Sequence, residues 1–182
     1  ITRSLGKAGH WVAVGAETEK SLAGSSKYCA EQFFYPSPLA GVKKAMEHLA
    51  CEVRKREIEY LVPVTDITVA PVIEFQNRLF PNIPIPYPPL QNVLQASDKF
   101  YLFQLAKQND IPIPETVFVQ QPVSPGEFEF DGLSFPLIVK PSRSIYREND
   151  QLVRASVSYI FDKNEFFRLC NEKKYLQRHP FM

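Results

Sequence analysis

A short apolar run between two prolines constrains the fold of this chain most. Leu137, Ile138 and Val139 lie between Pro136 and Pro141, and Lys140 follows the run directly. Proline cannot donate a hydrogen bond to a sheet, so it is confined to the ends and edges of strands. The pattern therefore predicts a short buried strand that ends at a lysine.

The lysine at the end of this strand needs a polar partner. A buried ammonium group is costly unless an anion meets it, and a phosphate is one candidate. Alternatively, the Lys140 side chain extends from the strand end into water.

A second lysine lies at a predicted helix start, 41 residues earlier. Residues 98–108 have helical spacing, and Ser97 is the expected N-cap. The inward side chains predicted for this helix are Tyr101, Leu102, Leu105 and Ala106. Lys99 lies in the first turn, where the helix dipole disfavours a cation. This position favours a role for Lys99 beyond helix stability, such as neutralising a phosphate.

The order of these motifs resembles the ATP-grasp superfamily, in particular its carbamoyl-phosphate-synthase-like carboxylate-amine ligases. Asp98-Lys99 comes first, residues 111–116 read Ile-Pro-Ile-Pro-Glu-Thr, and residues 135–141 read Phe-Pro-Leu-Ile-Val-Lys-Pro. In that family, the lysine of a DK motif and the lysine after a proline and three apolar residues bind nucleotide phosphates. The resemblance implies these roles for Lys99 and Lys140, with ATP and Mg²⁺ as cofactors.

The resemblance also implies further nucleotide contacts. Biotin-carboxylase-like members carry a glycine-rich run after the second lysine, whereas residues 142–151 contain no glycine. Ser142, Arg143 and Ser144 would supply hydroxyl and guanidinium donors there instead. Residues 175–180 resemble the family's hinge strand, which meets adenine, and this places Gln177 and Arg178 at the nucleotide.

The first 90 residues predict a Rossmann-like α/β domain. A helix over residues 1–8, a strand over 10–15, a loop over 16–37 and an amphipathic crossover helix from residue 38 fit a doubly wound sheet. The first strand, and any glycine-rich dinucleotide fingerprint, would precede residue 1. An NAD(P)-binding oxidoreductase therefore remains an open alternative.

A polar pair, Thr65-Asp66, follows a predicted buried strand over residues 60–64 and precedes a predicted helix over 67–79. Ligands bind at the carboxyl ends of parallel strands, so this pair is a weak candidate for substrate contact. A helix cap alone is the alternative. The proline-rich residues 83–89 then predict a linker and a domain boundary near residue 90.

The second half, residues 91–182, predicts the α+β small lobe of an ATP-grasp domain. Besides the strand ending at Lys140, the expected elements are strands at 116–119, 154–161 and 174–177 and helices at 90–96, 124–130 and 163–170. The family's magnesium ligands are expected beyond Met182, which makes the chain an amino-terminal fragment that is inactive alone. A non-catalytic nucleotide-binding module is a further alternative.

Composition limits the partners. The net charge of +1 in 182 residues gives no overall field for nucleic acid, and no apolar run approaches the roughly 20 residues that cross a membrane. The three cysteines, Cys29, Cys51 and Cys170, and the three histidines are widely spaced. We therefore expect free thiols, no metal site and a cytoplasmic location. The expected partners are a small-molecule carboxylate and a nucleophile, and a homodimer stays open.

Overall fold

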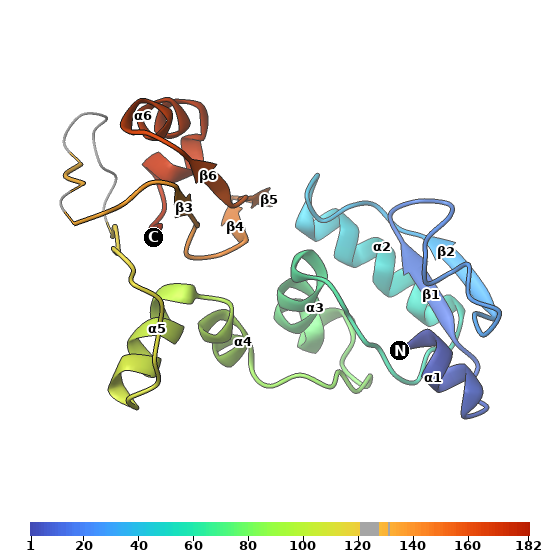
Figure 1. Cartoon of the computed structure of the whole chain (residues 1–182). Coiled ribbons are helices and arrows are strands. Elements are labelled where there is room, and N and C mark those ends of the chain that lie inside the picture. The colour runs from blue at the N-terminus through green and yellow to red at the C-terminus, as the bar shows by residue number, and fades with distance from the viewer. Residues whose placement is uncertain (121–127, 131) are drawn as a thin grey trace. The chain divides into compact units, whose positions relative to one another are not determined.

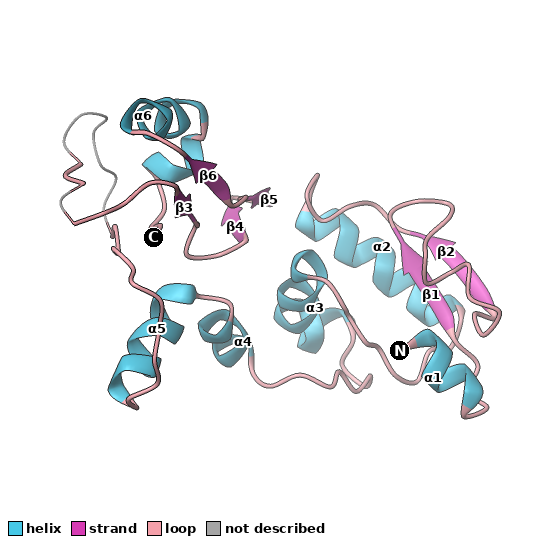
Figure 2. Ribbon diagram, in the orientation of Figure 1, coloured by secondary structure: helices cyan, strands magenta, loops and turns pink. Residues whose placement is uncertain are grey.

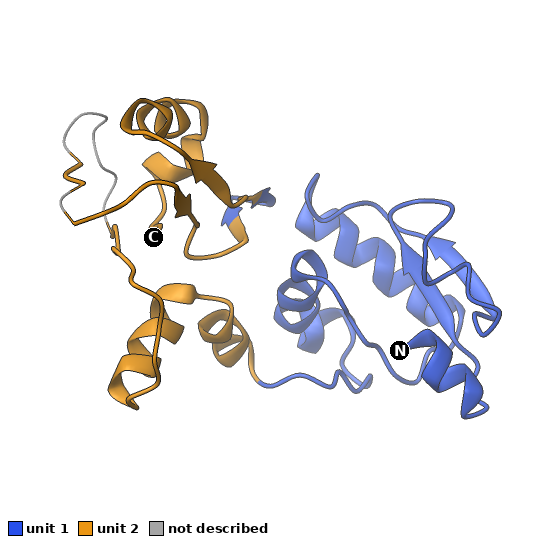
Figure 3. Cartoon of the chain, in the orientation of Figure 1, with its two compact units in different colours: residues 1–88, 147–153 blue, residues 89–146, 154–182 orange. Residues whose placement is uncertain are grey.

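The computed structural model describes residues 1–120, 128–130 and 132–182 (Figure 1). The chain forms two compact units (Figure 3). Unit 1 holds residues 1–88 and 147–153, and unit 2 holds residues 89–146 and 154–182. The domain assignment to residues 1–90 and 91–182 stays a prediction.

Unit 1 contains three helices and a small sheet among its described elements (Figure 2). In chain order these are α1 (Thr2–Lys7), β1 (Ala13–Ala16), β2 (Glu31–Phe34), α2 (Val42–Lys55) and α3 (Asp66–Leu79). The strands β1 and β2 are parallel, with Ala13 opposite Glu31 and Ala16 opposite Phe34. Because this sheet has only two strands, the Rossmann-like domain stays a prediction.

The helix α2 supplies most of the core of unit 1. Its buried side chains recur every three or four residues, as the sequence predicts: Val42, Ala45, Met46, Leu49, Ala50 and Val53. This face packs against α3. Burial of one large apolar side chain contributes about 1.5–3 kcal/mol to the free energy of folding. The buried face of α2 is therefore a major source of stability for unit 1.

Two predictions about unit 1 are wrong. Residues 16–37 are not all loop, because β2 pairs with β1 and the Gln32 side chain accepts a hydrogen bond from Ser21 Oγ at 3.0 Å. Residues 60–64 are not a buried strand. They make one backbone bond to the proline-rich segment, from Leu61 N to Pro84 O at 3.2 Å, and Tyr60 and Val64 are 54% and 61% exposed.

Unit 2 combines helices with short strands. Its elements are α4 (Leu90–Ala96), α5 (Lys99–Gln108), β3 (Leu137–Val139), β6 (Ser158–Ile160), α6 (Lys163–Glu172) and the 3-10 helix η1 (Lys174–Gln177). The strands β4 (Ile145–Glu148) and β5 (Gln151–Arg154) pair with each other and continue into the part of the chain that belongs to unit 1.

The sheet β3–β6 has one buried and one open face. The two strands are antiparallel, with Ile138 opposite Tyr159. Val139 and Ile160 point into the core and are 5% and 2% exposed, whereas Ile138 and Tyr159 are 44% and 65% exposed. The core beneath the sheet is rich in phenylalanine. Its buried members are Val119, Phe130, Val139, Ile160, Phe166, Cys170, Leu176 and Phe181.

Several predictions about unit 2 need correction. Residues 116–119 form no strand, because only Val119 makes a β-bridge, to Phe181. Residues 174–177 form η1 rather than a strand. Of the strand expected over 154–161, only Arg154, the last residue of β5, and β6 are strand. Most of the helix predicted at 124–130 lies outside the described residues, and its last three residues are not helical.

The predicted inward face of α5 is also wrong. Tyr101, Leu102 and Leu105 are 39–43% exposed. The rings of Phe100 and Phe103 instead contact Phe118, with centroids 4.7 and 5.9 Å away.

No helix in the described residues is long and apolar enough to cross a membrane.

Candidate functional site

The first turn of α5 is fixed by Asp98. One carboxylate oxygen, Oδ1, accepts hydrogen bonds from Phe100 N at 3.0 Å and Tyr101 N at 3.4 Å. The predicted N-cap, Ser97, instead donates to Leu94 O in the helix before. Aspartate and serine cap helices equally well, so the sequence does not decide between neighbours. Lys99 is the first residue of α5.

The backbone that follows β3 is held by hydrogen bonds to residues 180–182. Lys140 N donates to Met182 O at 2.7 Å, and Met182 N donates to Lys140 O at 2.8 Å. Ser142 N then donates to Pro180 O at 2.9 Å. Because the backbone stays extended and paired, side chains continue to alternate across the sheet. Lys140 therefore shares the open face with Ile138.

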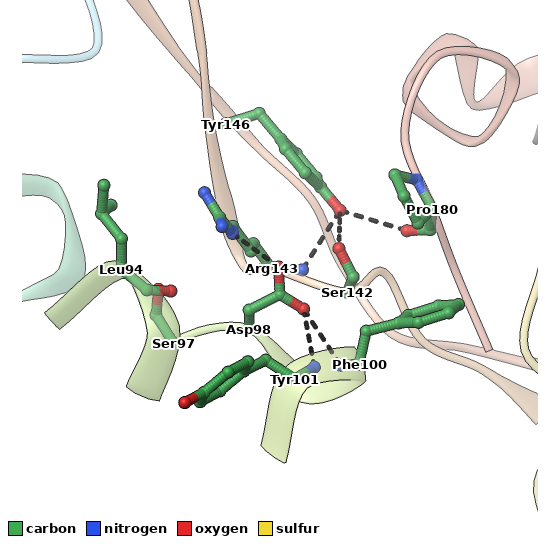
Figure 4. A network of polar contacts seen from close by, with 9 residues as sticks. All are labelled: Leu94, Ser97, Asp98, Phe100, Tyr101, Ser142, Arg143, Tyr146 and Pro180. Carbon is green, nitrogen blue, oxygen red and sulfur yellow. Dashed lines mark hydrogen bonds and ion pairs between the residues drawn. The ribbon is translucent and has the colours of Figure 1, made fainter. Parts of the chain in front are cut away.

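The structure brings these two lysine-bearing segments together within unit 2 (Figure 4). Lys99 N donates to Ser142 O at 2.9 Å, and Arg143 Nε pairs with Asp98 Oδ2 at 3.0 Å. These segments contribute the cationic residues Lys99, Lys140 and Arg143 and the acidic residue Asp98. A group of cationic residues can attract a polyanion although the whole chain is nearly neutral.

Tyr146 holds the segment that follows Lys140. Its hydroxyl accepts from Arg143 N at 3.1 Å, donates to Pro180 O at 3.2 Å and lies 3.1 Å from Ser142 Oγ. Its ring stacks on His179, with centroids 3.8 Å apart and planes at 9°. Tyr146 and Ser142 are both buried, at 8% and 2% exposure. The Tyr146 hydroxyl thus links Ser142 and Arg143 to Pro180 (Figure 4).

Ser142 and Arg143 are therefore placed beside the two lysines, but Ser142 is buried and bonded to protein groups. Ser144 is exposed, and its carbonyl accepts from Ala155 N at 2.9 Å.

The predicted hinge contacts lie elsewhere in unit 2. Gln177 Nε2 donates to Cys170 O at 2.9 Å, so this side chain closes the end of α6. Arg178 is exposed just after η1. The carbonyl oxygen of Pro180 accepts hydrogen bonds from Ser142 N and from the Tyr146 hydroxyl.

Thr65 and Asp66 belong to unit 1 and begin α3. Thr65 N donates to Thr68 Oγ1 at 3.2 Å, and the two hydroxyls lie 2.9 Å apart. Both Thr65 and Asp66 are exposed. The capping role accounts for Thr65, and substrate contact stays a prediction.

Sequence reasoning missed Tyr146 and His179. Tyr146 belongs to no motif, His179 is predicted only as part of the hinge segment 175–180, and their contact joins residues 33 positions apart in the chain. The one available signal was the alternation of Ile145, Tyr146 and Arg147, which indicates a strand with a buried aromatic residue.

The described residues bring together no group of three or more His, Cys, Asp or Glu side chains that could hold a metal ion.

Comparison with known proteins shows a likeness of fold. No family model and no curated protein matches the chain. Among the solved structures that it resembles is an L-amino acid ligase from Bacillus licheniformis, with a TM-score of 0.63 and 14% sequence identity. The match covers 99% of this chain and 39% of the ligase chain, so the chain spans well under half of that protein. The likeness shows that the mixed α/β fold of this chain, with its small sheets, is similar to part of that ligase chain.

Proposed function

We propose that this chain is the nucleotide-binding part of an ATP-dependent ligase of the ATP-grasp type. The observation that carries the proposal is the hydrogen bond from Lys99 N to Ser142 O, at 2.9 Å. It joins the first turn of α5 to the exit of the strand that carries Lys140. Two lysines that lie 41 positions apart thus start from neighbouring backbone segments, as binding to one triphosphate requires.

The open face of the β3–β6 sheet supports the same ligand. Ile138 and Tyr159 are exposed side by side on this face, and Lys140 continues it. Apolar side chains offer a surface for a flat base, and an aromatic ring can stack on it. An apolar patch beside a group of cations suits a molecule with a base at one end and phosphates at the other.

The reaction proposed for the whole enzyme is the activation of a carboxylate. ATP, when bound, supplies a phosphoryl group that converts the carboxylate to an acyl phosphate, which an amine or a similar nucleophile then attacks. The cationic side chains Lys99, Lys140 and Arg143 would spread the charge of the polyphosphate.

Magnesium receives no step in this proposal. No magnesium ligand is assigned among the described residues, because they bring together no group of three or more His, Cys, Asp or Glu side chains.

Two other functions fit less of the structure. An NAD(P)-binding oxidoreductase would explain neither Lys99 nor Lys140, and the likeness to a ligase does not favour it. A non-catalytic nucleotide-binding module would share the whole arrangement and differ only in lacking turnover.

Binding titrations on the full chain test the proposal. We expect saturable binding of ATP that weakens as salt is raised, because charged groups carry it, and no comparable binding of NAD⁺. NAD⁺ binding in preference to ATP would contradict the proposal. In the longer enzyme of which this chain is proposed to form a part, release of ADP that depends on an added amino acid would distinguish a ligase from a binding module.

A further inference from the structure

The two carboxylate oxygens of Asp98 accept hydrogen bonds from different parts of unit 2. Oδ1 caps α5 through Phe100 N and Tyr101 N, and Oδ2 accepts from Arg143 Nε at 3.0 Å. The same side chain therefore contacts the helix that begins with Lys99 and the loop that follows Lys140. Its side chain is 20% exposed.

Arg143 is held at both its backbone and its guanidinium group. Its backbone N–H donates to the Tyr146 hydroxyl at 3.1 Å. Among the described residues, its guanidinium makes a hydrogen bond through Nε, and Figure 4 shows a terminal nitrogen pointing away from Asp98. The side chain is 35% exposed. An arginine held in this way keeps its two terminal nitrogens for an oxyanion.

We propose that Asp98 is a positioning residue that orients Arg143 toward the polyphosphate of a nucleotide held by Lys99 and Lys140. The inference rests on the proposed function. It adds the guanidinium group of Arg143, held in one orientation, to the phosphate contacts of Lys99 and Lys140. Asp98 itself does not touch the nucleotide. Its contribution is to order the long arginine side chain before the ligand arrives, so that binding does not have to order it.

Two simpler roles for Asp98 predict different results. If Asp98 only caps α5, then Asp98→Asn is neutral, because asparagine caps a helix as well as aspartate does. If Asp98 acts only as a charge, then Asp98→Asn tightens phosphate binding, because it removes a negative charge from the site. Only the positioning role predicts weaker binding.

The experiment measures ATP affinity by titration calorimetry on the full chain for four proteins beside the wild type. These are Asp98→Asn, Arg143→Gln, the double variant of both, and Asp162→Asn. Asp162 is a matched control, since it caps α6 in the same unit by accepting from Glu165 N at 2.8 Å. Melting temperatures are measured in parallel.

We expect Asp98→Asn to weaken ATP binding about two- to tenfold, the cost of ordering one long side chain. Arg143→Gln should weaken it about tenfold or more, because a charge-assisted contact is lost. Adding Asp98→Asn to Arg143→Gln should change nothing further, and Asp162→Asn should bind ATP as tightly as the wild type. A role in folding alone would not produce this coupling between two positions.

The inference is overturned if Asp98→Asn binds ATP as tightly as the wild type or more tightly, or if its effect persists in the Arg143→Gln background. If Asp98→Asn lowers the melting temperature more than Asp162→Asn does, the ATP affinity of Asp98→Asn is no longer informative. The affinity of Arg143→Gln is then the test, and an affinity equal to that of the wild type overturns the inference. A wild-type chain that binds no ATP would instead overturn the proposed function.

Discussion

The substitution Tyr146→Phe removes one oxygen atom from the centre of the candidate site. The ring, its burial and its stacking on His179 are retained. Three contacts of the hydroxyl are lost, to Ser142 Oγ, Arg143 N and Pro180 O, at 3.1–3.2 Å. Pro180 O keeps its bond from Ser142 N.

The expected cost comes mainly from groups left without a partner. The Ser142 hydroxyl is 2% exposed and loses its contact with Tyr146. A buried polar group without a hydrogen bond costs about 1–3 kcal/mol, and the Arg143 N–H loses its acceptor as well. We therefore expect the free energy of unfolding of unit 2 to fall by about 2–3 kcal/mol.

Urea denaturation followed by amide hydrogen exchange measures this loss for unit 2 separately. Adding Ser142→Ala to Tyr146→Phe should recover about 1 kcal/mol, because it removes the orphaned hydroxyl. Tyr159→Phe is the control, since Tyr159 is 65% exposed on the open sheet face and should change stability by less than about 0.5 kcal/mol. A Tyr146→Phe protein as stable as this control would refute the reasoning.

Two further predictions concern titratable groups. Thiol labelling of the native chain should modify Cys51 first and Cys170 last, because Cys51 is exposed whereas burial raises the pKa of the Cys170 thiol; equal rates would contradict this order. Burial, assisted by nearby Glu17, raises the pKa of Tyr35 to about 12 from its usual 10. The folded chain therefore keeps a proton that the unfolded chain loses, so stability holds below pH 10 and falls by about 3 kcal/mol between pH 10 and 12. Tyr35→Phe should remove this part of the pH dependence, and an unchanged slope in urea denaturation would show that Tyr35 does not cause it.

The sequence predicts well where local pattern and tertiary contacts agree. The prolines around residues 137–139 correctly indicate β3, because a proline has no N–H to donate to a ladder, although only Val139 of the three strand residues is buried. The apolar stripe of α2 is likewise confirmed, since a helix needs no distant partner to form its hydrogen bonds. The three cysteines are free, as their wide spacing predicts.

Short strands were predicted less well because a strand depends on a partner elsewhere in the chain. β2 begins with the polar Glu31 and Gln32, so its apolar signal is limited to Phe33 and Phe34, yet pairing with β1 makes all four residues a strand. Residues 60–64 carry the apolar signal but make only one backbone bond, to Pro84. Local propensity for strands is weak compared with such pairing.

The candidate site could be predicted in part. The lysine motifs indicate which segments matter, but their meeting through Ser142 depends on a contact between distant parts of the chain. The contact between Asp98 and Arg143 could not be predicted for the same reason, and the sequence indicates Tyr146 only as a buried residue of a strand. Gln177, which is predicted to lie at the nucleotide, has a local explanation, since its side chain donates to Cys170 O at the end of α6.

The most direct test of the account is the ATP affinity of Lys99→Met and Lys140→Met in the full chain. Each substitution should weaken binding by about one to two powers of ten, because each removes a charge-assisted contact worth about 1.5–3 kcal/mol. Lys107→Met is the control, since Lys107 lies in the last turn of α5, away from Lys99. Melting temperatures should stay close to the wild-type value. Unchanged ATP affinity in both lysine variants, with lowered melting temperatures, would contradict the claim that the two lysines bind one nucleotide.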